Sequence, residues 1–410
     1  DEQDTTGTTG VGAFIQYAGV ADPVKLENCK LTNSSVKGGH WAGGLIGYTA
    51  GFSEIGNGER ASYVTLTNCS VTNSSVTSEG SVGGLIGHAG GDAWTYSTIT
   101  DCTVSSCTLT STNTSDWRVG DLVGTANVGQ VTIDQATVDH TKGNTRTQDS
   151  KEDNNNSIEN GLVGRAVLGD TGLLVVAGKV TAATGTVAIV TTAQGAMTQY
   201  SSLAAAVDEA AEGDTVKLVK KNSEAVTVKT QITLTAAEGV TFSGSLAFEE
   251  NSGDSTVDGV YFENTGKHNV ADIVTIKAPN VTVKNCEFTV PSAVWTYRAQ
   301  PNCIKIQWTS GAVIENNTFH LGRIQDSPGS NSTAPVNGHS NVAINVVGAS
   351  VSDITICNNT LYATKPSDDL AAGSTDEEKK ALSASVNMII AIGNGDSAYG
   401  IDELTITGNT

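Results

Sequence analysis

A short glycine-containing motif recurs through the first part of the chain, and this repeat limits the possible folds more than any other feature. The copies lie at residues 43–48 (GGLIGY), 83–88 (GGLIGH), 120–124 (GDLVG) and 160–164 (NGLVG), with a degenerate copy at 12–17 (GAFIQY). A motif repeated at intervals of this length is typical of a solenoid, in which each repeat packs only against its neighbours.

A second repeated segment lies between the glycine motifs. Its copies are residues 26–31 (LENCKL), 66–71 (LTNCSV), 99–104 (ITDCTV) and 133–138 (IDQATV). The first, fourth and sixth positions are apolar, an alternation at period two with one break. This pattern predicts strands whose inward side chains stack from one coil to the next, with the glycines at the bends.

The second half of the chain contains the same kind of strand at a different spacing. These segments are residues 257–262, 283–288, 314–319, 356–361 and 406–410, and the last four follow companion strands at 273–276, 303–306, 342–346 and 388–392. Because no helices separate these strands, a βαβ fold is excluded. We predict an all-β protein, a right-handed parallel β-helix (solenoid) in two β-helical units.

One helix is expected between the two units, near residues 201–211. Ser201 or Ser202 can cap its N-terminus, and Gly213 stands where a C-terminal glycine is favoured. Its apolar face consists of Leu203, Ala206, Val207 and Ala210. We interpret it as a lid on the open end of the second unit, which places the two domains at residues 1–184 and 185–410.

Two family resemblances follow from these segments. The first half resembles the GLUG-repeat segments of bacterial surface proteins through the Gly-Leu-x-Gly sequences at 44–47, 84–87 and 161–164, while Asp121 replaces the first glycine of another copy. The second half resembles the pectate-lyase-like β-helix superfamily through the helix, the following Gly213-Asp214-Thr215-Val216 and the Asn-rich coils. The resemblance implies the fold but not the activity, because lyases, glycosidases, phage spikes and adhesins share it.

Charge and cysteine content narrow the partners and the compartment. The net charge of −20 disfavours binding to nucleic acid or to anionic membranes, and no apolar run is long enough for a membrane span. We expect an extracellular or cell-surface location, a monomer, and a segment of a longer protein.

Of the seven cysteines, Cys29, Cys69 and Cys102 share one strand position with Ala136, so we expect reduced thiols packed in the core, although one disulfide bridge is possible.

Sequence signals for catalysis are weak. Residues 338–339, 368–369 and 323–325 resemble short polygalacturonase motifs, but they occur in the wrong order. No strand position supplies the pair of carboxyl groups that a glycosidase needs, and the six histidines are expected to be solvated loop residues. Residues 149–153 and 368–369 could hold calcium, although solvated loops are expected there. The sequence therefore favours binding over catalysis, with no cofactor other than possible calcium.

Insertions between the coils of the second half are the expected binding surface. They lengthen along the chain, and insertions at one corner of a solenoid gather on one face. The ligand-binding candidates are Trp295, Tyr297, Arg298 and Trp308, which suit a sugar, although the same aromatic residues could equally anchor loops. The leading hypothesis is an adhesin that recognises glycan or a host or microbial surface protein. The alternatives are a polysaccharide lyase or glycoside hydrolase acting in a groove of the second domain, and a spacer.

Overall fold

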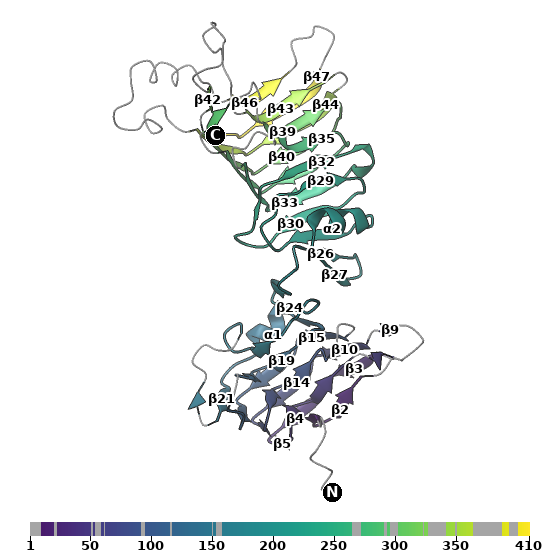
Figure 1. The fold of residues 1–410 in the computed structure, drawn as a ribbon, viewed down its shortest axis with the longest axis vertical. Coiled ribbons are helices and arrows are strands. Elements are labelled where there is room, and N and C mark those ends of the chain that lie inside the picture. Colours follow the sequence, from purple (N-terminus) through teal and green to yellow (C-terminus); the bar gives the residue numbers. More distant parts are fainter. Residues whose placement is uncertain are drawn as a thin grey trace, which may run out of the picture. The chain divides into compact units, whose positions relative to one another are not determined.

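The structure is a computed structural model, and it contains two compact units, Asp1–Gly185 and Thr186–Thr410. It describes residues 10–19, 23–50, 52–53, 59–60, 62–91, 95–114, 117–149, 151–152, 158–264, 272–290, 293–295, 302–322, 324–326, 342–348, 351–363, 388–392 and 401–410. Both units consist mainly of parallel strands stacked in sheets (Figure 1). The predicted parallel β-helix is therefore confirmed.

Five sheets run through the first unit, and neighbouring strands in a sheet come from successive coils. The glycine motifs lie in two of these sheets. One contains β1 (Gly10–Gly12), β6 (Trp41–Gly43), β13 (Ser81–Gly83) and β18 (Val119–Gly120). The other contains β2 (Ile15–Ala18), β7 (Ile46–Thr49), β14 (Ile86–Ala89), β19 (Val123–Ala126) and β23 (Val163–Ala166).

The remaining three sheets of the first unit hold the strands between the glycine motifs. The longest contains β3 (Val24–Glu27), β10 (Ser62–Thr67), β15 (Thr95–Thr100), β20 (Gln130–Ile133) and β24 (Leu173–Val176), with β25 (Lys179–Ala182) antiparallel at its end. The second contains β4 (Lys30–Thr32), β11 (Ser70–Thr72) and β16 (Thr103–Ser105). The third contains β5 (Ser35–Lys37), β12 (Ser75–Ser78), β17 (Thr108–Ser111), β21 (Thr145–Gln148) and antiparallel β22 (Lys151–Glu152). A short hairpin joins β8 (Phe52–Ser53) to β9 (Glu59–Arg60).

The break in the period-two pattern is a corner of the coil. Asn28, Asn68 and Asp101 occupy it with φ of 56°, 49° and 49°. Asn and Asp adopt this left-handed conformation more readily than other residues with side chains. The corner turns the chain between two sheets, so the apolar side chains on both sides of it point inward.

The fourth repeated segment, residues 133–138, departs from the prediction. Strand β20 ends at Ile133, and residues Gln135–Asp139 form helix α1. Asp134 caps this helix by accepting a hydrogen bond from Thr137 N at 2.9 Å. Thr137 Oγ1 accepts one from Cys102 N, also at 2.9 Å. The expectation that Ala136 occupies the cysteine position was wrong, because the Asp134 cap favours a helical turn over a strand.

Three sheets form the second unit. The first contains β28 (Thr215–Leu218), β30 (Thr233–Ala236), β33 (Thr256–Asp258), β36 (Thr282–Lys284), β40 (Val313–Glu315), β44 (Val351–Cys357) and β47 (Ile401–Thr407). The second contains β29 (Ala225–Val228), β32 (Ser245–Phe248), β35 (Asp272–Ile276), β39 (Asn302–Gln307), β43 (Val342–Val347) and β46 (Met388–Ile392). The third contains β31 (Thr241–Phe242), β34 (Tyr261–Glu263), β37 (Glu287–Val290), β41 (Thr318–Leu321) and β45 (Thr360–Ala363). A separate parallel pair joins β38 (Ala293–Trp295) to β42 (Ile324–Asp326), and a 3-10 turn spans Glu250–Ser252.

Two ladders hold the coils of the second unit together. Phe262, Phe288 and Phe319 are buried and stacked, with ring centroids 4.7 and 5.0 Å apart. At a neighbouring corner, Asn317 Nδ2 donates to Asn359 Oδ1 at 3.0 Å, and Asn359 Nδ2 donates to Asn409 Oδ1 at 2.9 Å. The asparagines therefore form a structural ladder that satisfies buried polar groups.

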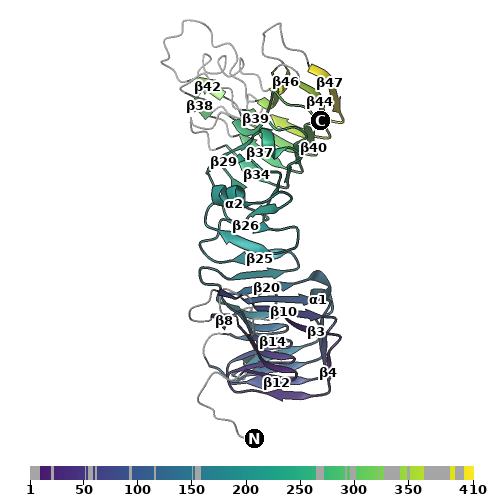
Figure 2. The same cartoon turned by 90° about the vertical axis from the view of Figure 1, so that its right-hand side faces the viewer.

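One end of the second unit carries a helix and a hairpin (Figure 2). Strand β26 (Ala188–Thr191) pairs antiparallel with β27 (Met197–Tyr200) and with β28. Helix α2 (Leu203–Glu209) follows, with Ser202 at its N-cap and with Leu203, Ala206 and Val207 buried. The helix ends before Gly213, whose φ of 86° belongs to the next turn rather than to the helix cap.

Candidate functional site

The glycines of the first unit bring two sheets into backbone contact. A Cβ on Gly43 would overlap the carbonyl oxygen of Ile46 and would lie 2.6 Å from Gly87 N. A Cβ on Gly47 would lie 2.6 Å from the backbone of Gly10. Only glycine allows so close an approach of two backbones. This approach places the side chains of Trp41 on β6 and Tyr48 on β7 beside one another.

Five aromatic side chains meet at this place, and we call them the aromatic patch: Tyr17, His40, Trp41, Tyr48 and His88. Tyr17, Tyr48 and His88 are in register on β2, β7 and β14. Tyr48 stacks on Trp41 with ring centroids 4.6 Å apart and on Tyr17 with centroids 5.3 Å apart. The centroid of His88 lies 5.1 Å from that of Trp41 and 5.2 Å from that of Tyr48.

The aromatic patch is accessible to a ligand. Tyr17 is 49% exposed and His40 is exposed, while Trp41, Tyr48 and His88 are half-buried. The hydroxyl, indole N–H and imidazole groups add hydrogen-bonding capacity to a largely apolar surface. Such a mixture is typical of sites that bind sugars or protein surfaces.

His88 is the electrostatically unusual member of the patch. Burial, together with the nearby charges of Arg118 and His40, lowers the pKa of His88 to about 4. Its Nε2 lies 3.4 Å from Asn127 Nδ2, and its buried Nδ1 has no hydrogen-bond partner in the described part of the chain. His88 is therefore a neutral imidazole near pH 7.

The expectation that the histidines are loop residues was wrong for two of them. His88 lies in β14, and His320 lies in β41, where it stacks on Tyr362 with centroids 5.0 Å apart. The sequence does carry a signal for the patch, because the first three glycine motifs along the chain each end in a tyrosine or a histidine. The contact with Trp41 has no such signal, since it depends on the packing of two sheets.

The four predicted ligand-binding residues are only partly described. Trp295 ends β38, and Tyr297 and Arg298 lie outside the described residues. Trp308 follows β39 in a left-handed conformation with φ of 52°, and it is 64% exposed. A Cβ on Gly348 would overlap the indole of Trp308, so this glycine leaves room for the ring. The grouping of these four residues into one site remains a prediction.

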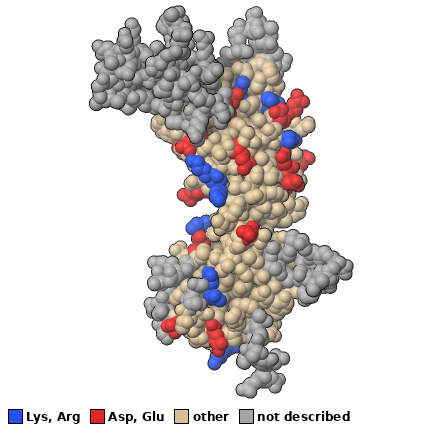
Figure 3. All heavy atoms as spheres, viewed as in Figure 1, with Lys and Arg blue, Asp and Glu red and all other residues tan. Residues whose placement is uncertain are grey.

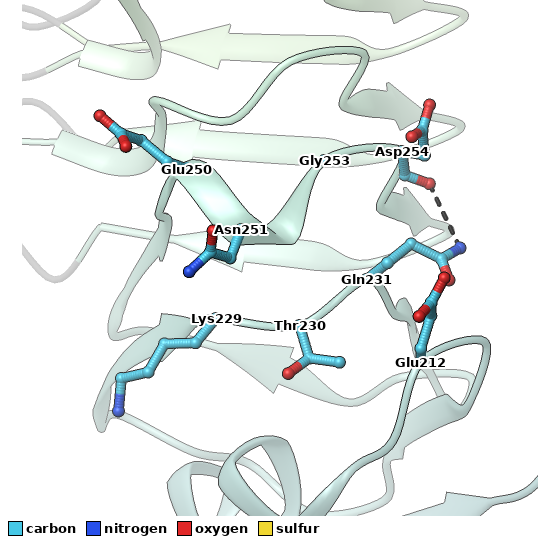
Figure 4. A pocket seen from close by; sticks show the side chains of 8 residues that line it. All are labelled: Glu212, Lys229, Thr230, Gln231, Glu250, Asn251, Gly253 and Asp254. Atoms are coloured by element: carbon cyan, nitrogen blue, oxygen red, sulfur yellow. Dashed lines mark hydrogen bonds between the residues drawn. The ribbon is translucent and has the colours of Figure 1, made fainter.

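A polar groove of about 600 Å³ lies at a corner of the second unit (Figure 4). Glu212, Lys229, Glu250 and Asp254 contribute its charges. Two of these groups already make contacts with other residues of the unit. Lys229 Nζ pairs with Asp208 at 3.1 Å, and Asp254 Oδ1 accepts from Asn280 Nδ2 at 3.1 Å.

The residues that could bind calcium and the polygalacturonase-like motifs lie mainly outside the described residues. Of the calcium candidates, Asp149 and strand β22 are described, and residues 368–369 are not. Of the motifs, residues 324–325 lie in β42, and residues 338–339 are not described. In the described ranges, no group of three or more His, Cys, Asp or Glu side chains is placed to hold a metal ion. A calcium site therefore remains a prediction.

The seven cysteines are free thiols in the structure. Cys69 and Cys102 occupy successive coils, with Cys69 N 3.4 Å from Cys102 Sγ. Burial raises the pKa of Cys102 and of Cys286 to about 12. Such thiols remain protonated and pack as small apolar side chains rather than as nucleophiles.

Comparison with known proteins gives one match. Residues 78–110, which contain β13 to β16, match the GLUG motif family. No curated protein and no solved structure matches the chain, so the pectate-lyase-like resemblance remains a prediction. Among the described helices, none has the length and hydropathy to cross a membrane. His88 of the aromatic patch lies within the matched segment. The GLUG motif suggests a surface or repeat protein.

Proposed function

We propose that the chain is an extracellular or cell-surface binding protein that recognises glycans through the aromatic patch of its first unit. The observation that carries this proposal is the clustering of Trp41, Tyr48 and His88 beside the half-exposed Tyr17. Aromatic rings bind the apolar faces and edges of sugars, and their polar atoms hydrogen-bond sugar hydroxyls. The repeated coils hold these side chains on strands rather than on loops, which lowers the entropic cost of binding.

The repeat itself suggests substitutions that remove the patch without disturbing the fold. Ser81 is in register with Trp41, and Thr125 is in register with His88. Trp41→Ser and Tyr48→Thr therefore introduce residue types that neighbouring coils already accept. Tyr362→Ala is a matched control, because Tyr362 is an exposed, stacked aromatic residue of the second unit.

Glycan-array screening followed by isothermal titration calorimetry tests the proposal. Wild type and Tyr362→Ala should bind the same glycans, while Trp41→Ser and Tyr48→Thr should each weaken binding by about tenfold or more, or about 1.4 kcal/mol. Circular dichroism checks that each variant is folded. Unchanged affinity in both patch variants would contradict the assignment of the site.

A polysaccharide lyase or glycoside hydrolase activity in the second unit is the second candidate function. It is favoured by the groove, which is lined by Glu212, Glu250 and Asp254 as well as by Lys229. Acidic polysaccharides incubated with the protein, with and without calcium, should then gain new reducing or unsaturated ends. Glu250→Gln should abolish this activity, and an absence of new ends would rule the activity out for those substrates.

A further inference from the structure

The outward face of β10, β15 and β20 carries a regular array of hydroxyl groups. We call it the threonine face, and its members are Thr65, Thr67, Thr98, Thr100 and Thr132. Thr65, Thr98 and Thr132 are in register on three successive coils, and Thr67 is in register with Thr100. The residues between them on these strands, such as Leu66 and Ile99, are fully buried, so the threonines point away from the core.

The hydroxyl groups of the threonine face make no hydrogen bond to the part of the chain that the structure describes. Elsewhere in the same unit such groups do pair between coils: Ser75 Oγ donates to Ser35 Oγ at 3.0 Å, and the hydroxyls of Thr32 and Thr72 are in contact. The threonine face therefore keeps its donors and acceptors available. Because χ1 of threonine is restricted, their directions are largely fixed.

Two tyrosines border the threonine face. Tyr63 and Tyr96 are in register, and their rings stack with centroids 5.1 Å apart and planes 15° apart. Tyr63 is 50% exposed, and Thr98 is also exposed. Burial raises the pKa of Tyr96, so its hydroxyl remains a donor at neutral pH. The tyrosines add a second line of hydroxyl groups beside the first.

The spacing and charge of this surface define the ligand that fits it. Successive strands are about 4.8 Å apart, close to the rise per sugar of an extended β-linked polysaccharide. The five threonines are uncharged. Among the described residues paired with them, the charged ones are Lys25 and Glu27 of the first coil. Two carboxylates, Asp101 and Asp134, lie at the end of the face, where the Asp134 side chain accepts hydrogen bonds from Asp101 N. Charged side chains are sparse on the side of the first unit shown in Figure 3. The overall charge of −20 disfavours acidic polymers.

We infer that the threonine face binds an extended, uncharged, β-linked polysaccharide that runs across the strands, with one sugar over each coil. The threonine hydroxyls hydrogen-bond the sugar hydroxyls, and their methyl groups contact the sugar C–H groups. This inference rests on the proposed glycan recognition and extends it to a surface that shares no residue with the aromatic patch.

Calorimetric titration of the full chain with cello-, manno- and chito-oligosaccharides of two to six sugars tests the inference. Affinity for at least one series should increase with length while sugars are added over the three coils, and should then level off. The variant Thr65→Val/Thr98→Val/Thr132→Val, which keeps β-branched residues, should bind about tenfold more weakly or worse. The control Thr77→Val/Thr110→Val alters an in-register pair of another sheet and should bind as wild type does.

The possible failures can be told apart. Absence of binding to all three series, or equal affinity of the triple valine variant and wild type, overturns the threonine-face inference. In either case the aromatic patch is still tested separately by Trp41→Ser. If Trp41→Ser binds the glycans normally while the triple valine variant does not, the threonine face is supported and the patch assignment is wrong.

Discussion

Acidification should destabilise the first unit through His88. The pKa of this histidine is lowered from 6.5 to about 4 because its ring is desolvated beside Trp41 and Tyr48. The unfolded chain therefore takes up a proton near pH 6.5, whereas the folded chain resists protonation until about pH 4. The stability contribution is complete above pH 6.5 and is lost as the pH falls from 6.5 to 4.

The size of this effect follows from the shift. The pKa difference of 2.5, from 6.5 to about 4, corresponds to about 3.5 kcal/mol at about 1.4 kcal/mol per pKa unit. Since the side chain is only half-buried, solvent screening reduces the expected loss to about 2 kcal/mol.

A single substitution isolates this contribution. His88→Tyr removes the titrating group and introduces the residue found in register at Tyr17 and Tyr48. Urea unfolding near pH 7.5 and near pH 4.5 should show that wild type loses about 2 kcal/mol more than His88→Tyr. NMR titration of the imidazole gives the pKa directly. A His88 resonance that titrates near 6.5, or equal losses in the two proteins, would refute the reasoning.

Other substitutions test the coil architecture. Gly43→Ala should lower the free energy of unfolding by about 3 kcal/mol or more in urea titrations, because the new Cβ overlaps the carbonyl oxygen of Ile46. A loss below about 1 kcal/mol would contradict the close contact between the two glycine-containing sheets. Asn359→Ala should cost about 2–4 kcal/mol by leaving ladder partners unpaired, and a neutral effect would disprove the ladder. Lys25, Lys30 and Lys37 lie on the edge strands of the first coil, in register with Thr or Ser of the next. Replacing all three with those residues should promote association in light scattering, and a monodisperse monomer would argue against a protective role for the lysines.

Much of the fold could be predicted because each coil repeats the same inward side chains. Leu66 and Ile99, which share a repeat position in the sequence, are in register in the structure and fully buried. The helix at 135–139 was missed because the apolar spacing of residues 133–138 matches that of the strands. Asp134 favours the helix because its side chain can cap a helix N-terminus. The cap depends on one hydrogen bond, from Thr137 N to Asp134 Oδ1, which an alignment of the repeated segments does not reveal.

The candidate site was harder to predict than the fold. The unrepeated insertions of the second half were the expected binding surface, and Trp308 is the one predicted ligand residue whose exposure the structure gives. The aromatic patch instead arises within the repeats, at positions that vary while the glycines beside them recur. Trp41 and Tyr48 lie on different strands, and only the close packing of two glycine-containing sheets brings their rings together.

A glycan-array screen of the full chain tests the central claim of glycan recognition most directly. The array should include uncharged β-linked glycans, sulfated glycans and uronic-acid polymers, at physiological salt. We predict binding to uncharged glycans and none to the polyanions, because the net charge of −20 disfavours polyanion binding. Binding to no glycan on the array, or to the polyanions alone, would contradict the proposal.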